Sequence, residues 1–129
     1  MNPLYHTILL DHYRYSRYRG TLANPDFSSE LHNPSCGDSV LFQGKMSGQV
    51  VMSLAFTGSG CVISQATASL LAQAAMGRPT HEIMSFDTVF IIGLIQMELG
   101  PTRLKCALLP LEALHQGIGG FRQDCVSQC

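Results

Sequence analysis

The chain has 129 residues, 46% of them hydrophobic, which is enough to build one core in a single domain over residues 1–129. Its 8 basic and 9 acidic residues nearly cancel, and this argues against nucleic acid or an anionic membrane as a partner. Residues 1–10 lack the pattern of a secretory signal, and the longest apolar stretch is far shorter than the ~20 residues that cross a bilayer. We therefore expect a cytoplasmic protein that works away from membranes.

The N-terminal half of the sequence predicts one helix followed by a small sheet. Apolar residues at helical spacing indicate a helix over residues 4–15. Turn signals then bracket a short edge strand at 27–32. Two further runs, 39–46 and 49–57, alternate as strands do, and Ser47-Gly48 between them is a hairpin signal. These three strands predict an antiparallel sheet.

The C-terminal half changes to helical spacing. The apolar pattern after Cys61 predicts a helix that reaches Gly77, the expected C-terminal cap, so Cys61 lies at a strand-to-helix junction. Shorter helices are expected at 80–84, with Thr80 as the N-terminal cap, and at 87–97.

The last helix is predicted from one continuous apolar stripe. It should begin at Pro101, in the favoured first turn, and end at Gly119-Gly120. Pro110 has no amide for the carbonyl of Cys106, so either the helix kinks there or it begins later than Pro101. The whole pattern predicts an α+β fold, in which an antiparallel sheet of about three strands is covered by helices.

Cys36 and Asp38 form the first candidate ligand pair. The chain has five cysteines and no secretory signal, so thiolate ligands or reactive sulfurs are a better explanation than a disulfide framework. Gly37 between the two residues frees the backbone, so a thiolate and a carboxylate can face one cation. The alternative is a turn with a buried cysteine and a capping aspartate.

Cys61 and Cys106 are the other candidate ligands. Cys61 follows Gly58-Ser59-Gly60 at a helix start, where unpaired amides and the helix dipole favour a thiolate, although a small residue filling the helix start is the alternative. Cys106 alone would be explained as a core residue. Together, three cysteines and one carboxylate supply the four ligands of a tetrahedral zinc ion or of one edge of an iron-sulfur cluster.

Three sequence blocks and the N-terminal segment together resemble a known family. The blocks are Asn-Pro-Ser-Cys-Gly-Asp, Thr-Gly-Ser-Gly-Cys-Val-Ile-Ser and Arg-Leu-Lys-Cys-Ala, and the segment is Ile8-Leu9-Leu10-Asp11-His12-Tyr13. In this order and separation they resemble the U-type iron-sulfur cluster assembly scaffolds, which are the IscU, SufU and NifU N-terminal-like proteins. The similarity covers nearly the whole chain.

The resemblance implies a ligand set, a cargo and partners. Cys36, Asp38, Cys61 and Cys106 take the ligand positions of the family, for a [2Fe-2S] cluster or iron, with zinc as the alternative occupant. Sulfur would come as persulfide from a pyridoxal-phosphate cysteine desulfurase, with Cys36 or Cys106 as the acceptor, and the cluster would pass to recipient apoproteins. On this basis the protein is a carrier and not an enzyme in the strict sense, or else a zinc-dependent persulfide acceptor that stimulates the desulfurase.

Some positions depart from parts of this family. Lys105 favours the SufU branch, whereas the span from Cys61 to Cys106 is too short for the extra segment that SufU proteins carry there. Leu99-Gly100-Pro101-Thr102-Arg103 differs from the Leu-Pro-Pro-Val-Lys stretch that housekeeping scaffolds present to an Hsp70-type chaperone. The branch therefore stays open, and that chaperone is not expected as a partner.

Two other classes of function are alternatives. A structural zinc domain would use the same ligands only to hold loops together, and it would unfold when a chelator removes the metal. A cysteine hydrolase needs a histidine base tied to a cysteine, and no motif supplies one. His32, near Cys36, is expected to be a surface imidazole in a turn, with a role as substitute ligand as the alternative, and Cys125 and Cys129 are expected to be spectators in a polar tail.

Overall fold

Three strands form an antiparallel sheet at the centre of the fold. The computed structural model describes the backbone of residues 3–34 and 37–128 and the side chains of residues 7–34 and 37–121. The strands lie in the order β1-β2-β3, with β1 at one edge, as the sequence predicts. Their bounds are Phe27–Asn33 for β1, Asp38–Ser47 for β2 and Val50–Ser59 for β3.

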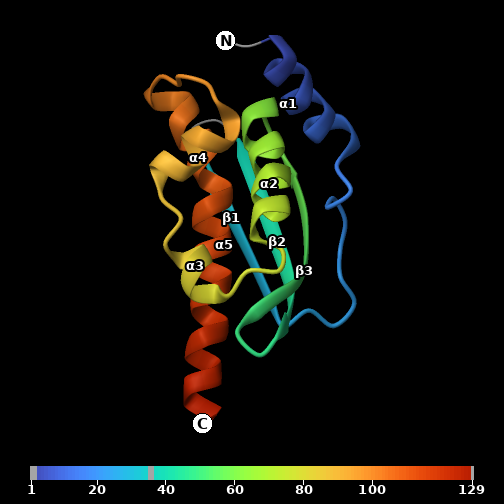
Figure 1. Cartoon of the computed structure of the whole chain (residues 1–129), viewed down its shortest axis with the longest axis vertical. Helices are drawn as coiled ribbons and strands as arrows, with labels where there is room; N and C mark the ends of the chain where they lie inside the picture. The colour runs from blue at the N-terminus through green and yellow to red at the C-terminus, as the bar shows by residue number, and fades with distance from the viewer. Residues whose placement is uncertain (1–2, 35–36, 129) are drawn as a thin grey trace.

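Helices cover one face of this sheet. Figure 1 shows α2 and α5 in front of the strands and α1 against α2, and the packing between these elements agrees. The predicted α+β fold is therefore confirmed. The helices are α1 (Pro3–Tyr15), α2 (Val62–Ala75), α3 (Thr80–Met84), α4 (Thr88–Ile95) and α5 (Pro101–Gln128). Within the described part of the chain, none of them is both long enough and apolar enough to cross a membrane.

The core lies between the sheet and α2 and α5. Along β2 every second side chain from Asp38 to Gly44 is buried, which places Val40 and Phe42 on the helix-covered face. The ring of Phe42 packs against Phe56 of β3, with 6.1 Å between centroids. Asp38 begins the same buried series, so the alternation of the strand turns its carboxylate toward the helices.

The predicted end of the last helix is wrong. α5 continues past Gly119 and Gly120 to Gln128, although two glycines in a row weaken a helix. Tertiary packing compensates, because Gly117 lies so close to Phe27 of β1 that a Cβ there would be 2.6 Å from the ring. Phe121, beyond both glycines, also packs against the core. Pro110 lies inside this one helix, so a start later than Pro101 is excluded.

The cap assigned to Thr80 is also wrong. Pro79 occupies the cap position of α3, and Thr80 is the first helical residue. The Thr80 hydroxyl instead donates to the side chain of Gln49, and the Thr80 amide donates to the Gln49 carbonyl. A long-range contact with the β2–β3 hairpin has therefore replaced the local cap. Asp87, by contrast, caps α4 by accepting from the Phe90 amide at 3.0 Å.

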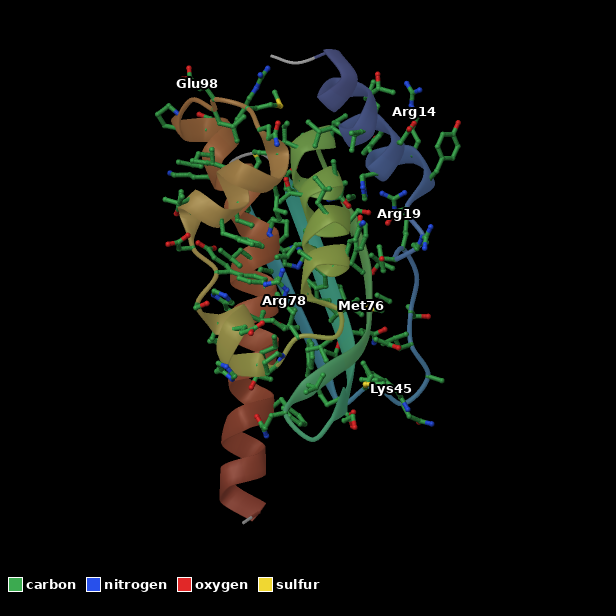
Figure 2. The ribbon with its side chains drawn as sticks, in the orientation of Figure 1. Arg14, Arg19, Lys45, Met76, Arg78 and Glu98 are labelled. Carbon is green, nitrogen blue, oxygen red and sulfur yellow. The ribbon has the colours of Figure 1, made fainter. Side chains whose placement is uncertain are left out.

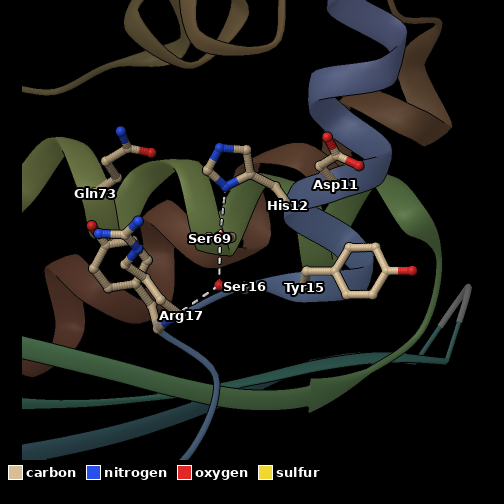
Figure 3. A pocket seen from close by; sticks show the side chains of 8 residues that line it. Asp11, His12, Tyr15, Ser16, Arg17, Ser69 and Gln73 are labelled. Carbon is tan, nitrogen blue, oxygen red and sulfur yellow. Dashed lines mark hydrogen bonds between the residues drawn. The ribbon is translucent and has the colours of Figure 1, made fainter.

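A hydrogen-bonded chain of three side chains joins α1 to α2. His12 Nδ1 lies 2.7 Å from Ser69 Oγ, and Ser69 Oγ lies 2.6 Å from Ser16 Oγ (Figure 3). Burial lowers the pKa of His12 from 6.5, and the nearby Asp11 carboxylate opposes this shift. The neutral imidazole is thus the form that the docked helix favours.

The stability of the protein should fall when His12 is forced to take a proton. Because the pKa of His12 is lower in the folded state, the unfolded chain binds more protons just below pH 6.5, so stability is lost as the pH falls through that region. We expect the unfolding free energy of His12→Asn to decrease less than that of the wild type between about pH 7.5 and about pH 5.5. Urea titrations at each pH measure the two unfolding free energies. Equal losses of stability in both proteins would contradict this role of His12.

Candidate metal centre

Asp38 contributes a buried carboxylate at the start of β2. Its side chain is only 1% exposed, and its Oδ1 accepts a hydrogen bond of 2.9 Å from the backbone amide of Cys61. A charged group in this position needs polar partners or a cation, because burial removes it from water. The amide of Cys61 satisfies one oxygen and orients the second, Oδ2, toward the Cys61 thiol at 3.6 Å.

The turn before α2 brings Cys61 to this carboxylate. Gly60 has a φ of +132°, which side chains rarely allow, and a Cβ there would lie 2.0 Å from Asp38 Oδ1. Only glycine therefore fits opposite Asp38. Cys61 then forms the N-terminal cap of α2, and its sulfur accepts a long hydrogen bond of 3.5 Å from the Ser64 amide. The predicted strand-to-helix junction at Cys61 is confirmed.

Cys106 approaches the same point from α5. It is 4% exposed and lies on the buried face of the helix, beside the core residue Ala107. Neither Cys61 nor Cys106 is in a disulfide, and Cys61 is the exposed one of the two. The pair therefore has one thiol at the surface and one beneath it.

Asp38, Cys61 and Cys106 meet at one point although they come from three separate elements. One carboxylate oxygen and the two sulfurs all lie within 4.8 Å of one another. Tetrahedral ligands about 2.0–2.3 Å from zinc stand about 3.3–3.8 Å apart, so these atoms need to close by only about 1 Å. Two thiolates and a carboxylate suit zinc or iron, and so the donor set fits such a metal.

The remaining predicted residues are not brought into this group. Cys36 and Cys129 lie outside the described residues, and Cys125 falls in α5 where side chains are not described. His32 is exposed and contacts Glu30 at 2.9 Å, so it is engaged elsewhere. Lys105, the residue before Cys106, lines a hollow of about 300 Å³ together with His32 and Glu112.

A second hollow adjoins the centre and was missed by the sequence analysis. It has a volume of about 610 Å³ and borders residues 58–60, the end of β3 that leads to Cys61. Two arginines and two tyrosines from α1 and the segment after it form the opposite side. The run Arg14, Arg17, Arg19 in the sequence is the signal that could have pointed to it.

Comparison with known proteins agrees with this geometry. The family of NifU-like N-terminal domains matches residues 4–127. The zinc-dependent sulfurtransferase SufU of Bacillus subtilis is 32% identical, with 92% of this chain and 91% of the relative covered. The iron-sulfur cluster assembly scaffold protein IscU of Thermotoga maritima is 38% identical over 89% of this chain and 92% of its own length. The crystal structure of FiSufU from Fervidobacterium islandicum superposes with a TM-score of 0.74 at 27% identity, covering 86% of this chain and 93% of that one.

The fold and the centre together define a class of protein. It is a small α+β domain in which a strand, a strand-to-helix turn and a long helix bring a carboxylate and two thiols together, in a group that could hold a metal ion. The chain belongs to the NifU-like N-terminal domain family, and the resemblance to U-type scaffolds is confirmed.

Proposed function

We propose that this protein is a scaffold on which an iron-sulfur cluster is assembled and from which the cluster passes to apoproteins. The observation that carries the proposal is the convergence of Asp38, Cys61 and Cys106 within 4.8 Å. Cys36, two residues before Asp38 in the sequence, completes a set of four ligands. Residues 1–129 act as one scaffold domain, and the thiols suit the reducing cytoplasm.

The burial of the ligands decides where cargo enters and leaves. Asp38 and Cys106 are buried, whereas Cys61 is exposed, so we expect iron and sulfur to enter from the side of Cys61. An oxygen ligand holds a cluster iron less tightly than a thiolate does. The Cys61 amide already holds Oδ1 at 2.9 Å, so the carboxylate keeps a polar partner when Oδ2 leaves the iron. Asp38 is therefore the release point of the cluster.

Anaerobic reconstitution with iron, cysteine and a cysteine desulfurase tests this function. The wild-type protein should gain the visible absorption of a [2Fe-2S] cluster, and Asp38→Ala should hold its cluster about tenfold longer against an acceptor apoprotein. Ser39→Ala is the matched control, because Ser39 neighbours Asp38 and its hydroxyl bonds to the Ser59 hydroxyl, at 3.3 Å. A cluster that leaves Asp38→Ala as fast as the wild type would show that the carboxylate is not the release point.

A zinc-dependent sulfur acceptor is the second candidate, and the likeness to the zinc-dependent sulfurtransferase SufU favours it. In this case the acceptor thiolate attacks the terminal sulfur of the desulfurase persulfide. A new S–S bond forms as the donor's S–S bond breaks, and the donor leaves as a thiolate. Of the two acceptors expected, Cys106 is buried, and Cys61, within 4.8 Å of it, is the exposed thiol of that pair.

Alkylation followed by mass spectrometry separates the two candidates. Zinc-loaded protein, given cysteine and desulfurase but no iron, should carry an extra sulfur on Cys36 or Cys106 if it is a sulfur acceptor. A protein that takes up no sulfur without iron, yet forms a cluster with it, is a scaffold only.

A further inference from the structure

The hollow beside residues 58–60, at the end of β3, is positively charged and aromatic. Tyr13, Arg14, Tyr15 and Arg19 line one side of it, and the described lining residues include no Asp or Glu. Figure 2 shows Arg14 and Arg19 one above the other on the side of the molecule that α1 forms. Among the described residues neither arginine has an ion-pair partner. We call this hollow, with its four named side chains, the arginine groove.

The opposite side of the arginine groove offers unpaired backbone at the edge of β3. Phe56 directs its amide and carbonyl outward, because they bond to Tyr18 and Gly20 of the segment after α1. Gly58, two residues further along the strand, faces the same way, and the described chain supplies no partner there. An extended peptide can add to a strand edge of this kind.

A buried acceptor completes the floor of the arginine groove. Gln65 is 3% exposed, and its Nε2 donates to the carbonyls of Ser39 and Ser59, which fixes the amide orientation. Its Oε1 accepts no hydrogen bond from the described residues. Gln65 lines the groove, and its Oε1 is itself buried, so a polar ligand reaches this oxygen only if the side chain shifts.

We propose that the arginine groove is the docking site for an extended acidic segment of the protein that delivers sulfur to the metal centre. Arg14 and Arg19 hold the carboxylates of the segment, and the edge at Gly58 pairs with its backbone. A segment seated there ends beside Cys61, because residues 58–60 lead directly to that residue. This inference rests on the proposed function and names the chemistry of the partner.

Matched charge reversals test the arginine groove. Arg14→Glu/Arg19→Glu reverses the charge of the groove, and Arg14→Glu alone changes an exposed side chain for which the described residues supply no ion-pair partner. Lys45→Glu/Arg78→Glu gives the same net charge at a distance from the groove (Figure 2). Arg19 lies over Phe56 and Arg78 over Phe86, each at 5.3 Å from the ring centroid, and Arg78 differs in also pairing with Glu82 at 4.0 Å.

Two probes report on these variants. The first is a short fluorescent peptide of alternating Asp and Val, with Asn replacing Asp as its control; the second is a cysteine desulfurase from the same organism. We expect both Arg14 variants to weaken binding of the Asp peptide and of the desulfurase about tenfold or more, and the distant pair to change neither. Zinc content and reconstitution with iron and inorganic sulfide should stay at wild-type levels, because they need no donor.

The possible outcomes separate the inference from the proposed function. Equal desulfurase binding by the wild type and the Arg14 variants, or equal losses in the distant pair, overturns the inference. Preference of the groove for a single-stranded oligonucleotide over the Asp peptide overturns it too. Failure of the wild type to form any cluster or persulfide, with peptide binding still dependent on Arg14 and Arg19, defeats the proposed function and leaves the acidic-segment site standing.

Discussion

The Cys61→Ser protein should lose zinc to a chromophoric chelator at concentrations where the wild type retains it, with an affinity lowered more than about a hundredfold. Loss of a group that only supports a ligand already costs about 10–100-fold, and Cys61 is expected to be a ligand itself. A serine hydroxyl is a much poorer ligand than a thiolate for zinc or iron. Because Cys61 is exposed, the substitution leaves the core intact.

Two further proteins control this result. Cys106→Ala should lose metal to a similar degree, with its apo stability measured separately because Cys106 is buried. Cys125→Ser should bind zinc as the wild type does. The metal-free wild type should stay folded, since apolar side chains form the described core between the sheet, α2 and α5. Unchanged zinc affinity in Cys61→Ser would show that Cys61 is not a ligand.

Gly60→Ala should damage both the fold and the metal centre. A methyl group at residue 60 would lie 2.0 Å from Asp38 Oδ1, and alanine there would have to adopt a φ of +132°. We expect the unfolding free energy to fall by about 2–4 kcal/mol and the zinc affinity to fall with it, because the carboxylate must move away. Urea unfolding and chelator competition measure the two effects.

Two other glycines separate the clash from the backbone effect. Gly48→Ala keeps a positive φ, +58°, but its methyl group meets nothing within 4 Å, so it should cost only about 1 kcal/mol and leave zinc affinity unchanged. Gly93→Ala lies in α4 with open space around it and should stabilise the protein by about 0.5–1 kcal/mol. If Gly60→Ala resembles Gly48→Ala in both measurements, the contact with Asp38 has no role in the centre.

Local patterns predicted most of the fold. The hairpin signal at Ser47-Gly48 correctly joined β2 to β3, although β3 begins at Val50, one residue later than expected. The change from strand to helical spacing placed Cys61 correctly, and Gly77 follows α2 with the left-handed φ of +81° that a C-terminal glycine cap requires. These features depend on neighbouring residues, so the sequence alone was sufficient.

The errors arose where distant contacts overrode local preference. Gly119 and Gly120 were predicted to end the last helix, but packing of Gly117 and Phe121 keeps α5 intact beyond them. Thr80 was predicted to be the N-terminal cap of α3, but its hydroxyl donates to the side chain of Gln49, 31 residues earlier in the chain. Neither contact leaves a local sequence pattern, because the partners become neighbours only in the folded chain.

Three of the candidate ligands that the structure brings together could be named from the sequence, but the packing that unites them could not. Asp38, Cys61 and Cys106 could be selected because thiolates and carboxylates are chemically distinctive ligands. Their unequal burial, and the fit of Gly60 against Asp38, depend on how β2, α2 and α5 pack together. The arginine groove was missed for the same reason, since α1 meets the end of β3 only in three dimensions.

X-ray absorption at the zinc edge of the zinc-loaded protein tests most directly whether these side chains bind one metal. The ligand set of Cys36, Asp38, Cys61 and Cys106 predicts a tetrahedral shell with sulfur at about 2.3 Å and a single oxygen at about 2.0 Å, in a ratio of three to one. In Cys61→Ser one sulfur should disappear from that shell. A shell of only oxygen and nitrogen, or one that Cys61→Ser leaves unchanged, would contradict the account.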